Sequence, residues 1–204
     1  MCTYSPQYPA IVAEYPIRCY KYLCKRPDGT YVTPYQLSPV EEGQFYEISD
    51  EQRENRQICV LQSHKLPYLL MHDEMPDVPY GEGETFFEIG KGMFHSYIYH
   101  EPCTKLFNTH ALDPVKQMSL FEPAIAVCYI PAKTKYFIGW NRITSSDTII
   151  AFRPDKPYWV QRTPEYCYSA QGDPDCYASE KIYYAKIYDN LKEFYKDETT
   201  NKMW

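Results

Sequence analysis

Ala124-Ile125-Ala126-Val127-Cys128-Tyr129-Ile130 is the most apolar run in the sequence, and Pro131 ends it. An unbroken run of seven apolar residues, several of them β-branched or aromatic, favours a strand that is buried on both faces over one at a sheet edge. We therefore predict that the strand at 124–130 lies at the centre of the core.

Further short runs of β-branched and aromatic residues lie before and after this strand, and glycine or proline separates them. Runs of this kind are typical of strands. We expect strands at 43–48, 58–62, 66–71, 85–89, 93–99, 135–140 and 148–152.

A turn signal separates 17–23 from 31–35, two more runs of this type. Pro27 presets φ, the Asp28 side chain bonds to nearby backbone, and Gly29 tolerates a positive φ. The sequence therefore predicts a β-hairpin around residues 26–30.

Helix signals are fewer. Ser49 and Gln52 have the spacing of a capping box, which predicts about two turns of helix, and a second short helix is expected at 114–121 after an Asp-Pro start. Tyrosines and aliphatic residues near one helical face predict a C-terminal helix from about 175 to 196. The alternative is a strand over 181–188, which is rich in Ile and Tyr.

Together these elements predict an α+β fold: one domain over residues 17–204, with a mixed, mostly antiparallel sheet and a C-terminal helix. A chain of 204 residues is long enough to bury such a core. Residues 1–16 carry Pro6, Pro9 and Pro16 among tyrosines, so we expect an extended N-terminal arm that either wraps its own domain or reaches a neighbour.

Composition restricts the partners. A net charge of −6 argues against general nucleic-acid binding, which needs a basic face. The N-terminus lacks the basic start and apolar run of a secretory signal, and no apolar run approaches the roughly 18 residues of a membrane span.

Without a secretory signal, the eight cysteines are expected to be free thiols. Cys167 and Cys176, which flank a Gly/Asp/Pro loop, form the one pair considered for a disulfide.

Four residues that can bind metals lie close together in the sequence: His95, His100, Cys103 and His110. Their spacing matches no established zinc pattern. We therefore favour histidines scattered over sheet and loop, and we predict no metal.

The tyrosine content is high, at 22 residues, with 3 tryptophans. These side chains bury a large area at little entropic cost and are enriched at interfaces. Tyr4, Tyr8, Tyr15 and Trp204 lie in the end segments and are candidate partner contacts. The alternative is that these ends fray.

The order of the predicted strands resembles the split β core of ADP-ribosyltransferases. Arg18 lies on an early strand, Ser96 on a glycine-aromatic-hydroxyl strand, and Asp147 before a late strand. The resemblance implies that Arg18 contacts a nicotinamide dinucleotide and that Ser96 lies beside its ribose. Asp147 stands where the family has its catalytic Glu, and its shorter side chain would reach the ribose less well.

Three segments resemble small uncharacterised bacteriophage proteins, including those of gut bacteria: Lys21–Tyr31, Gly92–Ser96 and Tyr177–Ile182. That family has no assigned chemistry. Because the sequence carries no catalytic signature and has a surplus of Tyr and Trp, we expect a non-enzymatic phage protein without cofactor that acts through protein–protein contacts, as a virion component or a host-directed effector, in the virion or the host cytoplasm. The alternative is an ADP-ribosyltransferase-like protein that binds NAD, with or without activity.

Overall fold

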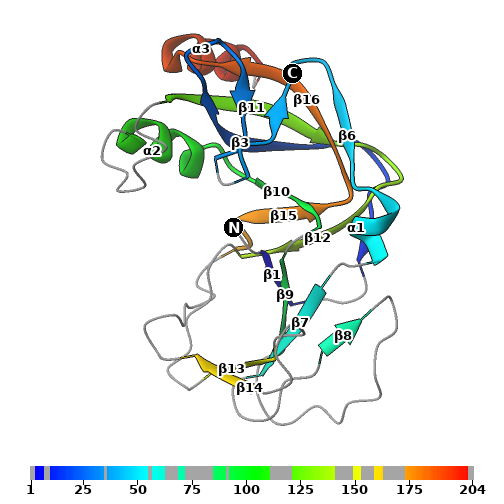
Figure 1. Cartoon of the computed structure of the whole chain (residues 1–204). Helices are drawn as coiled ribbons and strands as arrows, with labels where there is room; N and C mark the ends of the chain where they lie inside the picture. Colours follow the sequence, from blue (N-terminus) through cyan, green and yellow to red (C-terminus); the bar gives the residue numbers. More distant parts are fainter. Residues whose placement is uncertain are drawn as a thin grey trace. The chain divides into compact units, whose positions relative to one another are not determined.

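The computed structural model describes residues 3–6, 10–34, 36–54, 57–62, 69–71, 85–90, 92–110, 121–140, 149–152, 159–162 and 173–201. The chain divides into two compact units, which we treat separately (Figure 1). The first unit comprises residues 1–15, 47–95 and 132–181, and the second comprises 16–46, 96–131 and 182–204. The α+β class with a mostly antiparallel sheet is confirmed, whereas the single domain is not.

The second unit is built around β11 (Glu122–Ile130), as predicted. This strand pairs on one side with β3 (Ile17–Lys25) and on the other with β16 (Lys181–Tyr188), both antiparallel. Residues 124–128 and 130 are buried, which confirms a central strand enclosed on both faces. Beyond β16 lies β6 (Phe45–Glu47), the last strand on this side of the sheet among the described residues.

The predicted hairpin is confirmed. β3 pairs with β4 (Tyr31–Val32), which in turn pairs with β5 (Pro39–Val40). In the turn, the Asp28 carboxylate accepts a hydrogen bond from the Thr30 N–H at 2.9 Å, and Gly29 has a φ of +88°.

A C-terminal helix is confirmed, but its predicted start near 175 is wrong, and the alternative strand over 181–188 is correct. The chain there forms β15 (Cys176–Ser179) and β16, and helix α3 (Leu191–Asn201) begins only after Asn190, whose side chain accepts from the Lys192 N–H. Aromatic and aliphatic residues of this segment alternate between the two faces of a sheet, and pairing with β11 decides in favour of the strand. In Figure 1, α3 lies over one face of the strands of the second unit.

Helix α2 (Glu101–Thr109), which also belongs to the second unit, is absent from the sequence prediction. The residues of this helix have mixed polarity and show no clear apolar period. Pro102 in the first turn is compatible with a helix start and equally with a loop, so the sequence did not predict a helix here. The helix expected at 114–121 lies outside the described residues.

The first unit contains a four-stranded sheet in the order β1 (Thr3–Ser5), β9 (Thr85–Ile89), β7 (Gln57–Gln62) and β8 (Leu69–Met71). β12 (Lys135–Gly139) lies between β2 (Ile11–Val12) and β15. β13 (Ile149–Phe152) pairs with β14 (Trp159–Arg162), a strand that the sequence analysis missed. β10 (Phe94–Tyr97) carries the chain into the second unit.

The extended N-terminal arm is not confirmed. Thr3–Ser5 and Ile11–Val12 are strands of the first unit, and the Thr3 and Ser5 side chains are buried. The capping box at α1 (Asp50–Glu54) is confirmed, since the Ser49 and Gln52 side chains each accept from the other residue's N–H, at 3.1 and 2.8 Å.

Cys176 is buried, and its thiol donates to the Gly139 carbonyl oxygen with an Sγ to oxygen distance of 3.6 Å. Cys167, the other member of the pair considered for a disulfide, lies outside the described residues. Cys128 is a free thiol buried in the central strand, as expected. Among the described residues, no helix is long and apolar enough to cross a membrane.

Candidate functional site

Four side chains form a row across four adjacent strands of the second unit. Tyr129 on β11 lies opposite Arg18 on β3 and opposite Tyr183 on β16. The Tyr184 N–H donates to the Gln44 carbonyl at 3.0 Å, which puts Phe45 on β6 opposite Tyr183. Paired residues point to the same face of a sheet. We call Phe45, Tyr183, Tyr129 and Arg18 the aromatic row.

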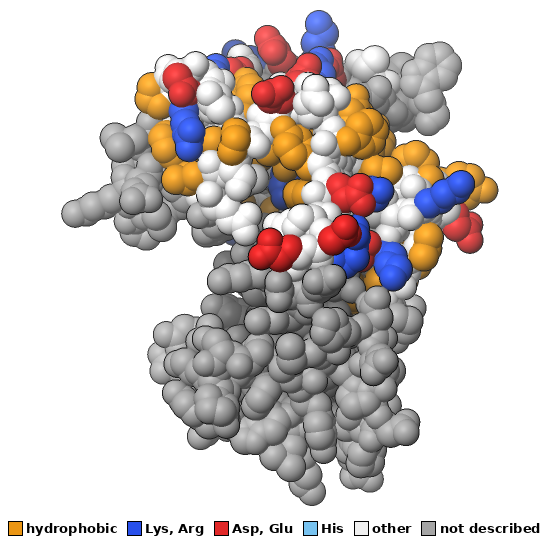
Figure 2. Space-filling view, turned by 45° about the vertical axis from the view of Figure 1, so that its right-hand side comes forward, with side chains coloured by type: hydrophobic (Ala, Val, Ile, Leu, Met, Phe, Trp, Pro, Cys, Tyr) orange, Lys and Arg blue, Asp and Glu red, His pale blue; other side chains and the backbone are white. Residues whose placement is uncertain are grey.

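The row is open to solvent at one end and held in place at the other. Phe45 is 67% exposed, whereas Tyr183 and Tyr129 are half-buried. The rings of Phe45 and Tyr183 stack with centroids 4.4 Å apart and planes 26° apart. Figure 2 shows hydrophobic side chains interspersed with acidic and basic ones on one face of the described part of the molecule.

A β-bulge brings the row into line. The pairing of β11 with β16 shifts register between Val127 and Cys128, so Tyr183 rather than its neighbour lies opposite Tyr129. Helix α3 covers the same face of the sheet, because Phe194 packs edge-on against Tyr20, two residues along β3 from Arg18. The row therefore lies beside α3 on this face of the sheet.

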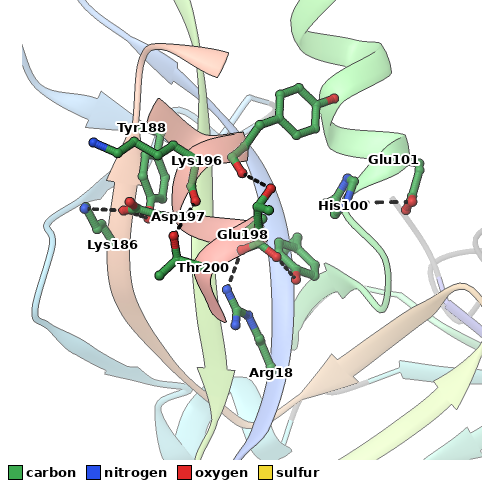
Figure 3. Close-up of polar contacts among 12 residues, drawn as sticks. Arg18, His100, Glu101, Lys186, Tyr188, Lys196, Asp197, Glu198 and Thr200 are labelled. Carbon is green, nitrogen blue, oxygen red and sulfur yellow. Dashed lines mark hydrogen bonds and ion pairs between the residues drawn. The ribbon is translucent and has the colours of Figure 1, made fainter. Parts of the chain in front are cut away.

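Glu198 of α3 fixes the Arg18 end of the row (Figure 3). Its carboxylate accepts from the Arg18 guanidinium through one oxygen and from the Tyr20 hydroxyl, at 2.9 Å, through the other. The Arg18 guanidinium lies 5.7 Å from the centre of the Tyr20 ring. Burial, and then the hydrogen bond to Glu198, raise the pKa of Tyr20, so this phenol stays a donor. The network orients Arg18 and leaves its side chain 31% exposed.

Of the three residues assigned by the ADP-ribosyltransferase resemblance, Arg18 and Ser96 point to opposite faces of the sheet. Tyr97 lies opposite Tyr20, so these two point to the same face of the sheet, and Arg18 shares that face. Ser96, one residue before Tyr97, therefore points to the other face, where it is buried. Asp147 lies outside the described residues.

Two of the candidate metal ligands are occupied by hydrogen bonds. The His95 ring contacts the Thr3 hydroxyl and the Gly90 carbonyl, each at 2.9 Å, in the first unit. The His110 ring, in the second unit, bonds to the Tyr22 hydroxyl and the Phe121 carbonyl.

The other two candidate ligands lie in the second unit. His100 packs among the rings of Tyr20, Phe194 and Tyr195. Cys103 is buried on α2, and this burial raises the pKa of its thiol. In the part of the chain that the structure describes, no three acidic, His or Cys residues are grouped to bind a metal.

Of the contact residues predicted in the end segments, Tyr15 is 76% exposed. The side chain of Tyr4 and all of Tyr8 and Trp204 lie outside the described residues. Arg18 was predicted from the sequence for a different role, whereas Phe45, Tyr129 and Tyr183 were not predicted as site residues. The only local signal for the row was Phe45 in a short run after Gly43, at what proved to be a sheet edge.

Comparison with protein-family models, with curated proteins and with solved structures found no match to this chain. The candidate site therefore depends on its own geometry.

Proposed function

We propose that this protein is non-enzymatic and acts through contact with another protein, with the aromatic row as its contact surface. The observation that carries the proposal is Phe45, a large apolar side chain that is 67% exposed on the last strand of the sheet and stacked on Tyr183. When a partner covers an exposed aromatic side chain, apolar surface is removed from water, and this contributes favourably to the free energy of binding.

The composition and rigidity of the row favour a protein partner. Tyrosine and arginine are the residues that most often dominate binding energy at protein interfaces. The Phe45–Tyr183 stack and the Arg18–Glu198 ion pair already fix the side chains, so binding costs little additional side-chain entropy. A bacteriophage is the setting that we propose, as a virion component or a host-directed effector, on the resemblance of the three segments named above.

Partner binding can be tested with paired variants. Proteins captured by the wild-type chain but not by a Phe45→Ser, Tyr183→Ser variant are identified, purified and titrated by calorimetry. We expect the double variant to bind at least about tenfold more weakly, the loss typical of a residue that dominates an interface.

The matched control is Tyr99→Ser, since Tyr99 is also an exposed aromatic residue of the second unit, at 50%, but lies outside the row. It should keep wild-type affinity. Equal affinities for the wild type and the double variant would contradict the proposal.

A further inference from the structure

We propose that β6 pairs with β6 of a second copy of this chain, in an antiparallel and symmetric dimer. The inference rests on the proposed function and names the partner at the Phe45 end of the aromatic row. Two features of β6 support it: its free edge at the exposed Phe45, and its self-complementary sequence.

The free edge follows from the hydrogen-bond pattern. Residues before and after Phe45 bond toward the β16 side, since the Gln44 carbonyl accepts from the Tyr184 N–H and the Ile48 N–H donates to the Glu180 carbonyl. In an antiparallel ladder the groups of alternate residues point to opposite sides, so the N–H and C=O of Phe45 point away from β16. Among the described residues, no strand pairs with that outer side.

The free edge of β6 is narrow and presents Phe45. Edge strands commonly avoid pairing with other chains through short length, a charge, a proline or a bulge. β6 has three residues and ends on Glu47, and the Gly43 N–H and the Gln44 carbonyl both bond to Tyr184, which forms a bulge before Phe45. These features leave the large, exposed Phe45 as the residue that offers free pairing groups and an apolar side chain together.

The strand is complementary to its own copy. An antiparallel pair with its two-fold axis at Phe45 lets the two Phe45 residues exchange both N–H to O=C bonds and brings their side chains together. Glu47, the charged residue of β6, then falls opposite Gly43 of the second copy, so the two carboxylates do not meet. The two Phe45–Tyr183 stacks would become one continuous aromatic ladder.

The charge of the second unit also permits self-association. It contains equal numbers of basic and acidic residues, so the whole net charge of −6 falls on the first unit. Two copies of a neutral unit meet without net electrostatic repulsion.

The test measures the molar mass of the purified full chain by sedimentation equilibrium, from about 1 μM to about 1 mM. We expect the mass to rise with concentration from 24.1 kDa toward twice that value. Phe45→Lys and Phe45→Glu should each remain monomeric, because like charges meet at the axis. An equimolar mixture of these two variants should dimerise again, because only a symmetric contact brings residue 45 against itself.

Tyr99→Lys is the control and should dimerise like the wild type, and circular dichroism verifies that each variant is folded. A wild-type chain that stays monomeric at about 1 mM, a dimer that survives either charge at residue 45, or a mixture that stays monomeric would each overturn the inference. A captured partner that needs Phe45 while the chain alone is monomeric would overturn this inference and leave the proposed function standing. If the chain neither dimerises nor captures a partner that needs Phe45, both this inference and the proposed function would be overturned.

Discussion

Arg18 on β3 and Glu198 on α3 are 180 residues apart in the sequence and form an ion pair in which the Glu198 side chain is 7% exposed. The Tyr20 hydroxyl donates to the second oxygen of the same carboxylate. The pair ties the C-terminal helix to the central sheet and holds the basic end of the aromatic row. A buried carboxylate depends on its donors, so the contact is expected to be important for stability.

The first prediction is that Arg18→Ala lowers the free energy of unfolding by about 2–3 kcal/mol, because it leaves the Glu198 carboxylate buried with one donor fewer. Urea denaturation at pH 7 measures this loss. The control is Lys25→Ala, which breaks the more exposed pair of Lys25 with Asp189 and should cost clearly less. Equal costs for the two variants would show that burial of Glu198 does not matter.

Local signals were enough for the centre of the fold. The apolar run at 124–130 and the turn residues Asp28-Gly29 each specify their structure locally, and both form the predicted elements. The local pattern of segment 175–188 does not specify its structure, because its tyrosines fit a helical period and a strand period about equally. Only its pairing with β11, more than fifty residues away in the sequence, decides between them.

The aromatic row could not be predicted from the sequence for a related reason. Which residues meet across strands depends on register, and here a bulge at Val127 and Cys128 sets the register of Tyr129 against Tyr183. No local pattern encodes that alignment. Arg18 was found through a resemblance whose other residue, Ser96, points to the opposite face of the sheet.

The second prediction concerns the anchor of α3. The Phe194 side chain is fully buried and contacts the rings of Tyr20, His100 and Tyr188. Phe194→Ala should lower the free energy of unfolding by about 3–5 kcal/mol, through lost burial and a residual cavity. Its neighbour Tyr195 is 42% exposed, so Tyr195→Ala should cost clearly less. Thermal unfolding followed by circular dichroism compares the two, and a similar cost would mean that α3 is not anchored through Phe194.

The third prediction is a pH dependence at Asp197. Its carboxylate accepts from Lys186 at 2.7 Å and from the Tyr188 hydroxyl at 2.9 Å, and the Lys186 bond, followed by the Tyr188 bond, lowers the pKa of Asp197 below 3.8. The folded state therefore binds this proton more weakly than the unfolded state. The contact stabilises the fold above pH 3.8, and the contribution is lost as the pH falls through the lowered pKa.

Asp197→Asn should consequently unfold at lower urea than the wild type at pH 7, and the difference should shrink as the pH falls below 3.8. Lys186→Ala removes the principal cause of the pKa shift and should show the same convergence with the wild type. Urea midpoints measured from pH 7 down to about pH 3, below the unfolded pKa of an aspartate, provide the comparison. A difference that stays constant over this range would rule out the ionised Asp197 contact as its source.

The fourth prediction separates backbone conformation from packing at two glycines. A Cβ added to Gly29 or to Gly90 would meet no atom within 4 Å, so neither position is closed by neighbours. Gly29 has a φ of +88°, in the region that costs other residues about 1–2 kcal/mol, whereas Gly90 lies outside that region. Gly29→Ala should therefore destabilise the protein by about 1 kcal/mol.

Gly90→Ala should be neutral or slightly stabilising, because it restricts the unfolded chain without straining the folded one. The two variants make the same chemical change in equally open space, so the difference between their urea midpoints isolates the cost of the positive φ in the hairpin turn. If both variants were neutral, the Asp28-Gly29 turn would have to adopt a different conformation in solution, and the register of β3 with β4 would change with it.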